Sequence, residues 1–216
     1  RQPLFYWKNM DGNIIGAQYK YIKDNVCQKR FLKNTDRSNS LWMTPIEGSK
    51  ALFVTEDPLD AIAHSQLFPG ARYAYLCTGG TSTKAQREMI HSFSQKFKLP
   101  IILGNDNDLA GQLENFKLAY HTANIEYAIN SKTQRVLLTV NGAEREWGKD
   151  EIVAALQAVM KQRPNMILSI PWAKDWNDDL RSSKKSISLR IAENMVRAQI
   201  ETTKSEQRGM IAGKLP

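Results

Sequence analysis

The sequence predicts an α/β protein in which helices cover a parallel sheet on both faces, preceded by an amino-terminal, mainly β subdomain. Three observations lead to this fold class. Short apolar stretches alternate with helix-like stretches through the middle of the chain, and they show no polar alternation, as expected for strands that are buried on both faces. Residues 4–33 differ, because strand-like segments there follow one another without an intervening helix.

The amino-terminal β unit consists of three strand-like segments, LFYWKN, IIGAQYKYI and KRFL. A DGN turn separates the first two segments. We expect Trp7 and Trp42 to lie in the core of this unit, and we predict an internal boundary near Ser49.

Three strand–helix units are predicted next. ALFVTE (51–56) precedes a helix-like PLDAIAHSQLF, in which Pro58 falls in the first turn, where a missing N–H costs nothing. YAYLCT (73–78) precedes a helix that begins at a Ser/Thr cap, and PIILGND precedes a third helix over residues 109–123.

The remaining chain contains further strands and helices. Asn141-Gly142 between two alternating segments predicts a hairpin. A helix over residues 149–162, the strand MILSIP, the polar loop WAKDWNDDL and a final amphipathic helix follow in that order.

The composition is that of a soluble globular protein, because 42% of the 216 residues are hydrophobic and both signs of charge are present. No apolar run is long enough to span a bilayer and no signal-peptide pattern is present, so we expect a cytoplasmic protein that does not contact a membrane. Cys27 and Cys77 are expected to be reduced and buried. The three histidines form no cluster, so no zinc site is predicted.

Positive charge is concentrated at the two ends of the chain. Residues 1–50 and 181–216 each carry a net charge of +5, whereas residues 51–180 carry −2. Two interpretations remain open: the basic ends hold a polyanion beside an acidic centre, or the lysines only solubilise the terminal segments.

Acidic residues follow two of the predicted parallel strands. Glu56 ends the first strand and Asp60 lies one helical turn further on, while Asp106 and Asp108 follow the third strand. Ligands of open parallel sheets bind beyond the carboxyl ends of the strands, so these acids are expected to converge there. A hard divalent cation would offset their repulsion, and we predict Mg²⁺, with Mn²⁺ as a substitute. The alternative for the D-x-D pair is a solvated turn.

Two further features have more than one interpretation. The TGGTST loop (78–83) ends a strand and opens a helix, so it either cradles a phosphate or forms an ordinary capped turn. Trp172 and Trp176 could stack on bases, but packing of the loop against the sheet is the preferred interpretation.

The motifs VTEDPLDAI, TGGTSTKAQ and GNDNDLAG, in this order and at these intervals, resemble the Toprim domain, and in particular its bacterial primase branch. Toprim domains are shared by bacterial primases, type IA and type II topoisomerases and some nucleases. The resemblance covers residues 11–123 and 170–180 and suggests a protein of a plasmid, phage or mobile element. It implies a Toprim-like sheet.

The resemblance implies a role for each acid. Glu56, Asp106 and Asp108 would be the catalytic metal ligands. Asp60 and Asp175 would be additional metal ligands or would support the ligands.

The resemblance also implies nucleic-acid or phosphate contacts. These are assigned to Lys20 and Arg30 in the amino-terminal unit, and to the loop and the helix start after it, at Gly79, Gly80, Thr81 and Lys84. The chain departs from the family at Asn177, which replaces a second acid, and at Asp57-Pro58, which replaces a glycine.

Three segments follow from the resemblance. Residues 1–49 would form a primase-core-like β subdomain, and residues 50–180 a Toprim domain with a hairpin–helix insertion at about 125–165. Residues 181–216 would form a basic helix and tail.

The function implied by the resemblance is a Mg²⁺-dependent, primase-like nucleotidyltransferase that synthesises primers on single-stranded DNA from nucleotides, with a helicase or relaxase as a further partner. Two alternatives remain: a Toprim nuclease, and a non-catalytic DNA-binding module of a replication or relaxase protein. A topoisomerase is disfavoured because it requires a nucleophilic tyrosine on a separate domain.

Overall fold

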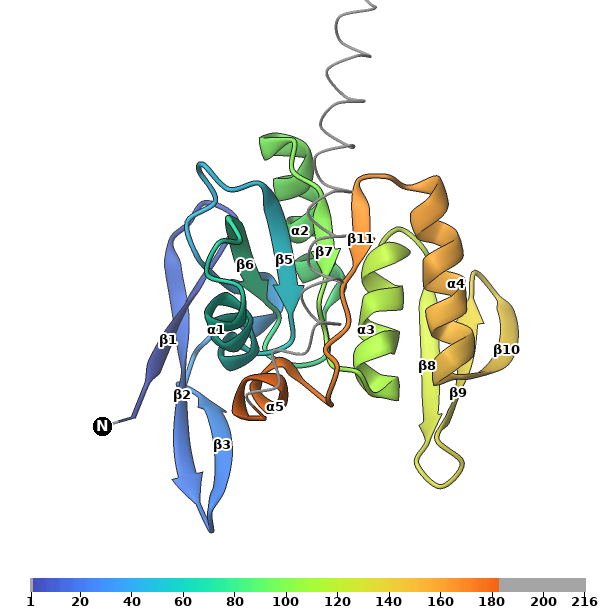
Figure 1. Cartoon of the computed structure of the whole chain (residues 1–216), viewed down its shortest axis with the longest axis horizontal. Coiled ribbons are helices and arrows are strands. Elements are labelled where there is room, and N and C mark those ends of the chain that lie inside the picture. The colour runs from blue at the N-terminus through green and yellow to red at the C-terminus, as the bar shows by residue number, and fades with distance from the viewer. Residues whose placement is uncertain (1, 183–216) are drawn as a thin grey trace, which may run out of the picture.

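The computed structural model describes residues 2–182, so the predicted final helix and nearly all of the predicted basic tail lie outside the described residues. One large sheet organises this part of the chain (Figure 1). Its strands are β1 (Leu4–Lys8), β2 (Ile14–Lys23), β3 (Val26–Phe31), β4 (Leu41–Met43), β5 (Ala51–Thr55), β6 (Tyr73–Cys77), β7 (Ile101–Leu103) and β11 (Met166–Leu168).

The sheet has the strand order β11-β7-β5-β6-β4-β1-β2-β3. Its first four strands are parallel, as the apolar segments predict, and every residue of β5 and β6 is buried. β4 pairs antiparallel with β6, and β1, β2 and β3 continue the sheet as antiparallel neighbours. The amino-terminal strands therefore extend the parallel sheet without a break. The three-residue β4 was not predicted, because so short a segment shows no periodicity.

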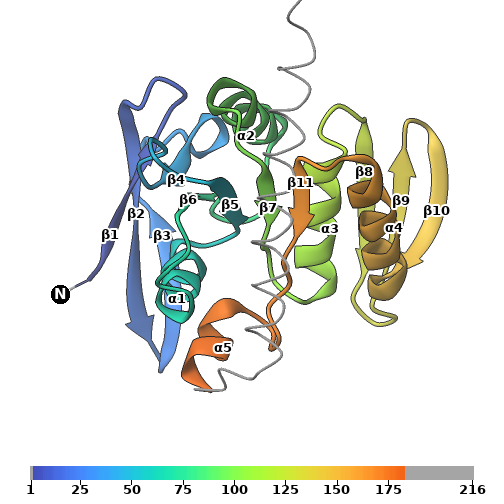
Figure 2. The ribbon, with the colours of Figure 1, turned by 45° about the horizontal axis from the view of Figure 1, so that its top comes forward.

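Helices cover both faces of the parallel strands. They are α1 (Pro58–Leu67), α2 (Lys84–Phe97), α3 (Leu109–Ala119), α4 (Lys149–Gln162) and α5 (Trp176–Arg181), together with the short 3-10 helix η1 (Arg37–Asn39). Apolar residues of α2 and α3 pack on the face that carries Leu52 and Leu76. Residues of α1 and α5 pack on the opposite face, around Phe53. Figure 2 shows α2 on one side of β5 and β7, and α1 and α5 on the other.

A second, three-stranded antiparallel sheet follows α3. It consists of β8 (Ile125–Asn130), β9 (Arg135–Val140) and β10 (Ala143–Gly148), and α4 packs against it. The predicted hairpin joins β9 to β10: Asn141 and Gly142 have φ values of 50° and 86°, as a two-residue turn of this type requires. β8 was not predicted, because it is largely exposed and lacks a clear alternation.

Three side-chain predictions were wrong or incomplete. Cys27 is exposed, because it lies near the tip of the β2–β3 hairpin, whereas Cys77 is buried as expected. Trp172 is 66% exposed, but Trp176 is buried because it opens α5, a helix within the segment predicted to be a polar loop. Trp7 lies in the core, as predicted, whereas Trp42 is only partly buried and packs against the cluster around Phe53. Among the described residues, no helix is long and apolar enough to cross a membrane.

Candidate metal and phosphate site

Acidic side chains follow β5 and β7, which are neighbours in the parallel part of the sheet. Glu56 comes directly after β5, and Asp60 lies buried in the first turn of α1. Asp106 and Asp108 follow β7, and Asp108 is the N-cap residue of α3. Because β5 and β7 pair in parallel, these residues meet beyond the carboxyl ends of the strands.

The carboxyl groups at this edge are close enough to change each other's ionisation. Burial, followed by the negative charges of Asp60, Glu56, Asp108 and Asp175, raises the pKa of Asp106 to about 8. The structure therefore brings together the five acids that the sequence suggested as metal ligands. We call these five residues the acidic edge.

Asp60 is the second carboxyl group with a strongly altered pKa. Burial, followed by the charges of Asp57 and Asp175, raises the pKa of Asp60 to about 7, although a hydrogen bond from Asn177 opposes this shift. Asn177 Nδ2 donates to Asp60 Oδ1 at 2.6 Å. Asn177 occupies the position at which the Toprim resemblance implies an acidic residue. In this structure its side-chain amide donates a hydrogen bond to the carboxyl group of Asp60.

Asp175 reaches the acidic edge because α5 is anchored to the end of β7. The indole N–H of Trp176 donates to the carbonyl oxygen of Gly104 at 2.8 Å, and Asn107 N–H donates to the carbonyl oxygen of Lys174 at 2.7 Å. The Asp175 carboxylate caps α5. This anchoring role of Trp176 was not predicted, because its partner lies 72 residues earlier in the chain.

Two lysines from the amino-terminal strands neutralise part of the acidic charge. Lys20 on β2 is buried and forms an ion pair with Asp57. Lys29 on β3 lies directly opposite Lys20, with its Nζ 3.1 Å from Glu56 Oε1 and 3.7 Å from Asp57 Oδ2. Lys29 was not singled out from the sequence, although its pairing with Lys20 in a hairpin is the pattern that could have identified it.

Arg30 lies away from the acidic edge. It pairs with Tyr19 across the β2–β3 hairpin, and its side chain is exposed. Successive side chains of a strand point to opposite faces, so Arg30 points away from the face on which Lys29 meets Glu56. The structure thus separates Lys20 from Arg30, the two cations that were predicted to contact phosphates.

The loop of residues 78–83 runs beside the acidic edge. Gly79 N–H donates to the carbonyl oxygen of Glu56 at 2.8 Å. Gly79 and Gly80 have φ values of 75° and 136°, and a Cβ at Gly79 would lie 2.5 Å from the Trp7 ring. The turn therefore requires glycine at Gly79.

The side chains of Glu114, which is buried, and Arg37, which is partly buried, fix the shape of this loop. Glu114 accepts hydrogen bonds from the backbone N–H and the hydroxyl group of Ser82, at 2.8 and 2.6 Å. Arg37 donates to the carbonyl oxygen of Thr81 at 2.6 Å. Thr81 itself is exposed, and the side chain of Lys84, in the first turn of α2, is 75% exposed.

The acidic edge supplies carboxylate oxygens, which are the ligands that Mg²⁺ prefers. Within residues 2–182, no group of three or more His, Cys, Asp or Glu side chains is already arranged to hold a metal ion. Lys29 and Asn177 already bind one oxygen each of Glu56 and Asp60, so a cation at the acidic edge would compete with both groups. Lys20 pairs with Asp57, which is not one of the five acids. Burial and, after it, the negative charges of neighbouring carboxyl groups raise the pKa of Asp106, and a hard divalent cation would offset those charges, so the edge fits such a cation.

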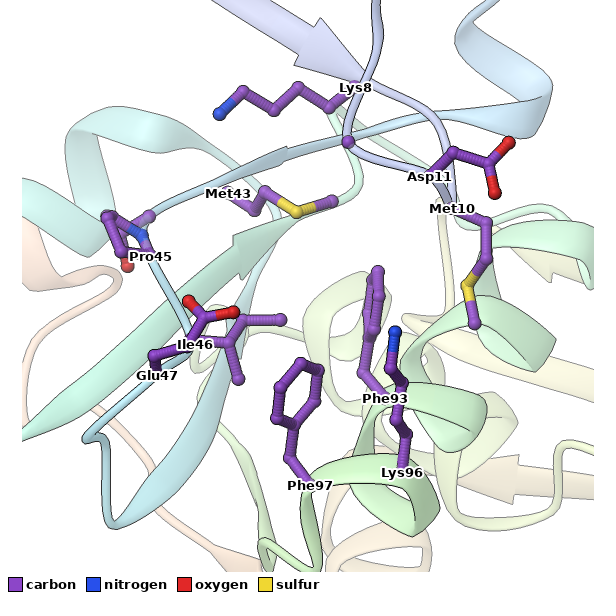
Figure 3. A pocket seen from close by; sticks show the side chains of 12 residues that line it. Lys8, Met10, Asp11, Met43, Pro45, Ile46, Glu47, Phe93, Lys96 and Phe97 are labelled. Carbon is purple, nitrogen blue, oxygen red and sulfur yellow. The ribbon is translucent and has the colours of Figure 1, made fainter.

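A cavity of about 210 Å³ lies elsewhere, between the β1–β2 turn, the segment after β4 and α2. Figure 3 shows Met43, Ile46, Phe93 and Phe97 around the same space, with Lys8 and Lys96 at its margin. None of the five acids lines this cavity, so it is separate from the candidate metal site.

A comparison with known protein families finds a match in the part of the chain that contains most of the acidic edge. Residues 53–136 match the family model described as Toprim-like. The chain contains a Toprim-like domain. The matched residues of this Toprim-like domain include four of the five acids and the loop of residues 78–83, whereas Asp175 and the amino-terminal strands lie outside the match. No curated protein matches the chain.

Three of the solved structures to which the chain is similar are primase fragments or domains. The primase fragment of the bacteriophage T7 primase-helicase protein is 15% identical, with a TM-score of 0.45, over 84% of this chain and 59% of that chain. The DNA primase domain from Pseudomonas aeruginosa is 12% identical, with a TM-score of 0.38, over 74% and 50%. The RNA polymerase domain of Mycobacterium tuberculosis primase DnaG, in complex with double-stranded DNA, is 17% identical, with a TM-score of 0.38, over 99% and 70%.

Replacing Asp106 with asparagine should stabilise the Toprim-like domain in the absence of metal, and only at higher pH. The folded pKa of Asp106, about 8, lies above the usual 3.8, so between these values the folded chain retains a proton that the unfolded chain releases. The free energy of unfolding of the native protein therefore falls as pH rises, and asparagine removes this loss. We expect Asp106→Asn to be more stable by on the order of 2 kcal/mol at pH 8 and nearly equal at pH 4.

Urea unfolding with a chelator present measures this difference. Asp24→Asn, in the exposed β2–β3 turn, is the matched control and should show no pH-dependent gain. An Asp106→Asn protein that gains equally at both pH values would contradict the assigned cause.

Proposed function

We propose that this chain is a metal-dependent, primase-like nucleotidyltransferase that synthesises primers on single-stranded DNA. The observation that carries the proposal is the acidic edge, in which five carboxyl groups from three segments of the chain converge within and beside a Toprim-like domain. The glycine-containing loop of residues 78–83 and the ammonium group of Lys29 lie at the same edge. Oxygen ligands beside phosphate-binding groups suit phosphoryl transfer.

In the proposed reaction, a 3′-hydroxyl oxygen bonds to the α-phosphorus of a nucleoside triphosphate, pyrophosphate leaves, and the hydroxyl proton passes to solvent. A divalent cation held by Glu56, Asp106 and Asp108 would supply charge neutralisation and a lowered pKa of the hydroxyl group. The carboxyl groups of Asp60 and Asp175 would add negative charge beside this cation. Because Lys29 already pairs with a carboxylate, it could transfer this pairing to a phosphate oxygen.

Incorporation of labelled nucleotides on single-stranded templates tests this function, with a cleavage assay in parallel. Template-dependent, Mg²⁺- or Mn²⁺-dependent products that disappear in the Asp106→Asn/Asp108→Asn variant are expected. Cleavage without synthesis would instead support a nuclease that uses the same acids. Activity that persists in the variant would show that Asp106 and Asp108 are required for neither reaction.

Lys29→Met should separate phosphate binding from metal binding. Loss of the ammonium group removes a competitor for Glu56, so Mn²⁺ should bind more tightly. The same loss removes a charged hydrogen-bond donor, so we expect nucleoside triphosphate to bind about tenfold more weakly. Equilibrium binding of each ligand measures both effects, with the exposed Lys33→Met as control. If Lys29→Met bound Mn²⁺ more weakly and nucleoside triphosphate with unchanged affinity, the prediction would be wrong.

Asp175 has two roles that a pair of variants can separate. Its carboxylate caps α5 by accepting a hydrogen bond from Asp178 N–H at 2.8 Å, and its charge raises the pKa of Asp106. Asparagine keeps the cap and removes the charge, whereas alanine removes both. We expect both variants to lower primer synthesis about tenfold while the tightest Mn²⁺ site stays occupied, and only Asp175→Ala to lose about 1 kcal/mol of stability. Full activity of Asp175→Asn would show that only the cap matters.

A further inference from the structure

β1, β2 and β3 carry positive charge without negative charge. These strands contain no Asp or Glu, and their cations are Lys8, Lys20, Lys23, Lys29 and Arg30. The flanking acids Asp11 and Asp24 lie in the connecting turns rather than in the strands. Because Lys20 and Lys29 pair with acids, the positive charge that can attract a polyanion comes from Lys8, Lys23 and Arg30.

The two faces of these strands differ in chemistry. Lys20 and Lys29 occupy the face that meets the acidic edge. On the opposite face, Tyr19 pairs with Arg30, and strand alternation places Tyr21 beside Tyr19. We call this opposite face, with Tyr6, Tyr19, Tyr21 and Arg30, the outer face.

The tyrosines of the outer face lie next to one another. The ring centroids of Tyr19 and Tyr21 are 5.7 Å apart, with an angle of 35° between the planes. Tyr6 on β1 pairs with Ala17, two residues before Tyr19, so it is a diagonal neighbour of Tyr19 on the same face. Tyr6 is 51% exposed, and Arg30 is exposed beside Tyr19.

No described helix lies over this face. In Figures 1 and 2, β1 and β2 form the left margin of the described chain, and the helices lie to their right. The carboxy-terminal residues 183–216 carry seven Lys or Arg and three Asp or Glu, so their charge has the same sign as that of the outer face. An anionic occupant is therefore favoured over this segment of the chain.

We propose that the outer face binds single-stranded DNA, with bases stacking on Tyr6, Tyr19 and Tyr21 and with Arg30 contacting the phosphates. Aromatic rings beside cations are the chemistry with which proteins hold single strands without reading their sequence. A duplex fits less well, because its bases already stack on one another and do not reach the rings. As a surface that holds the template, the outer face rests on the proposed function, but DNA binding itself requires no metal.

Fluorescence anisotropy with a labelled oligothymidylate tests the proposal. We expect Tyr6→Thr/Tyr19→Thr to weaken binding at least about tenfold, because the stacking of bases on aromatic rings contributes much of the affinity in such sites. Threonine preserves the strand propensity of both positions. Arg30→Gln should lower the slope of log affinity against log salt by about 0.7.

Tyr127→Thr is the matched control, because Tyr127 is a 39% exposed tyrosine on β8 in the second sheet, and this variant should bind normally. If thermal melting shows that the double variant is unfolded, the single Tyr6→Thr variant, at an exposed position, replaces it. An abasic oligonucleotide should bind equally to native and tyrosine-substituted proteins. Unchanged oligothymidylate affinity in the tyrosine and Arg30 variants, or an equal loss with the abasic strand, would overturn the proposal.

The test is independent of catalysis when it is repeated in the Asp106→Asn/Asp108→Asn background. Tyrosine-dependent binding there supports the outer face even if the native protein synthesises no primers. Primer synthesis by the native protein, together with tyrosine-independent binding, supports the proposed function and rejects the outer face.

Discussion

Primer synthesis is expected to fall at least about 10³-fold when Glu56 is replaced by glutamine, while the fold is kept. The Glu56 side chain is 31% exposed directly after β5, so the slightly different amide fits without a new cavity. The change removes a charged oxygen from the acidic edge and leaves Lys29 without its partner at 3.1 Å. Because exposed ion pairs contribute little, stability should change by less than about 1 kcal/mol.

Glu88→Gln is the matched control for Glu56→Gln. Glu88 also pairs with a lysine, Lys84 at 3.9 Å, but it lies on the exposed side of α2. The control should retain native activity and native metal binding. Glu56→Gln protein that retains more than about a tenth of the native rate would show that Glu56 is not a catalytic metal ligand.

Mn²⁺ should stabilise the native protein strongly and the Asp106→Asn/Asp108→Asn variant not at all. At a metal concentration about 100 times the dissociation constant, binding to the folded state contributes about 2.7 kcal/mol, which raises the melting temperature of a chain of this size by about 5–10 °C. Asparagine at position 108 keeps the cap of α3, where Asp108 Oδ1 accepts from Gly111 N–H at 2.9 Å. The backbone of Asp106 keeps its hydrogen bond from Gln112.

Differential scanning calorimetry with and without Mn²⁺ measures this gain. Asp11→Asn/Asp24→Asn changes the net charge equally at two exposed turn positions and should keep the full gain. A gain of native size in the Asp106→Asn/Asp108→Asn protein would place the metal elsewhere.

The strand-end acids could be located from sequence because their positions depend on local order. Glu56 directly follows one apolar segment and Asp106 lies three residues after another, and parallel strands place such ends at one edge. The N-cap preference of aspartate likewise places Asp108 at the start of α3. These features need no knowledge of distant contacts.

Contacts between distant residues could not be predicted in this way. Trp176 is buried because its indole N–H reaches Gly104, and nothing near Trp176 in the sequence indicates this partner. Lys29 and Arg30 are adjacent in sequence, but strand alternation directs only Lys29 to the acidic edge. A register shift of one residue would exchange their roles, so the pairing in the hairpin had to be known first.

The claim that the acidic edge binds a divalent cation is tested most directly by calorimetric titration of Mn²⁺ near pH 7 in two buffers with different heats of ionisation. The raised pKa values of Asp60 and Asp106 predict that binding releases protons, so the measured heat should depend on the buffer. We expect at least one Mn²⁺ per native chain with such proton release, and no binding by Asp106→Asn/Asp108→Asn. Absence of binding by the native protein, or equal stoichiometry and affinity in the variant, would contradict the claim.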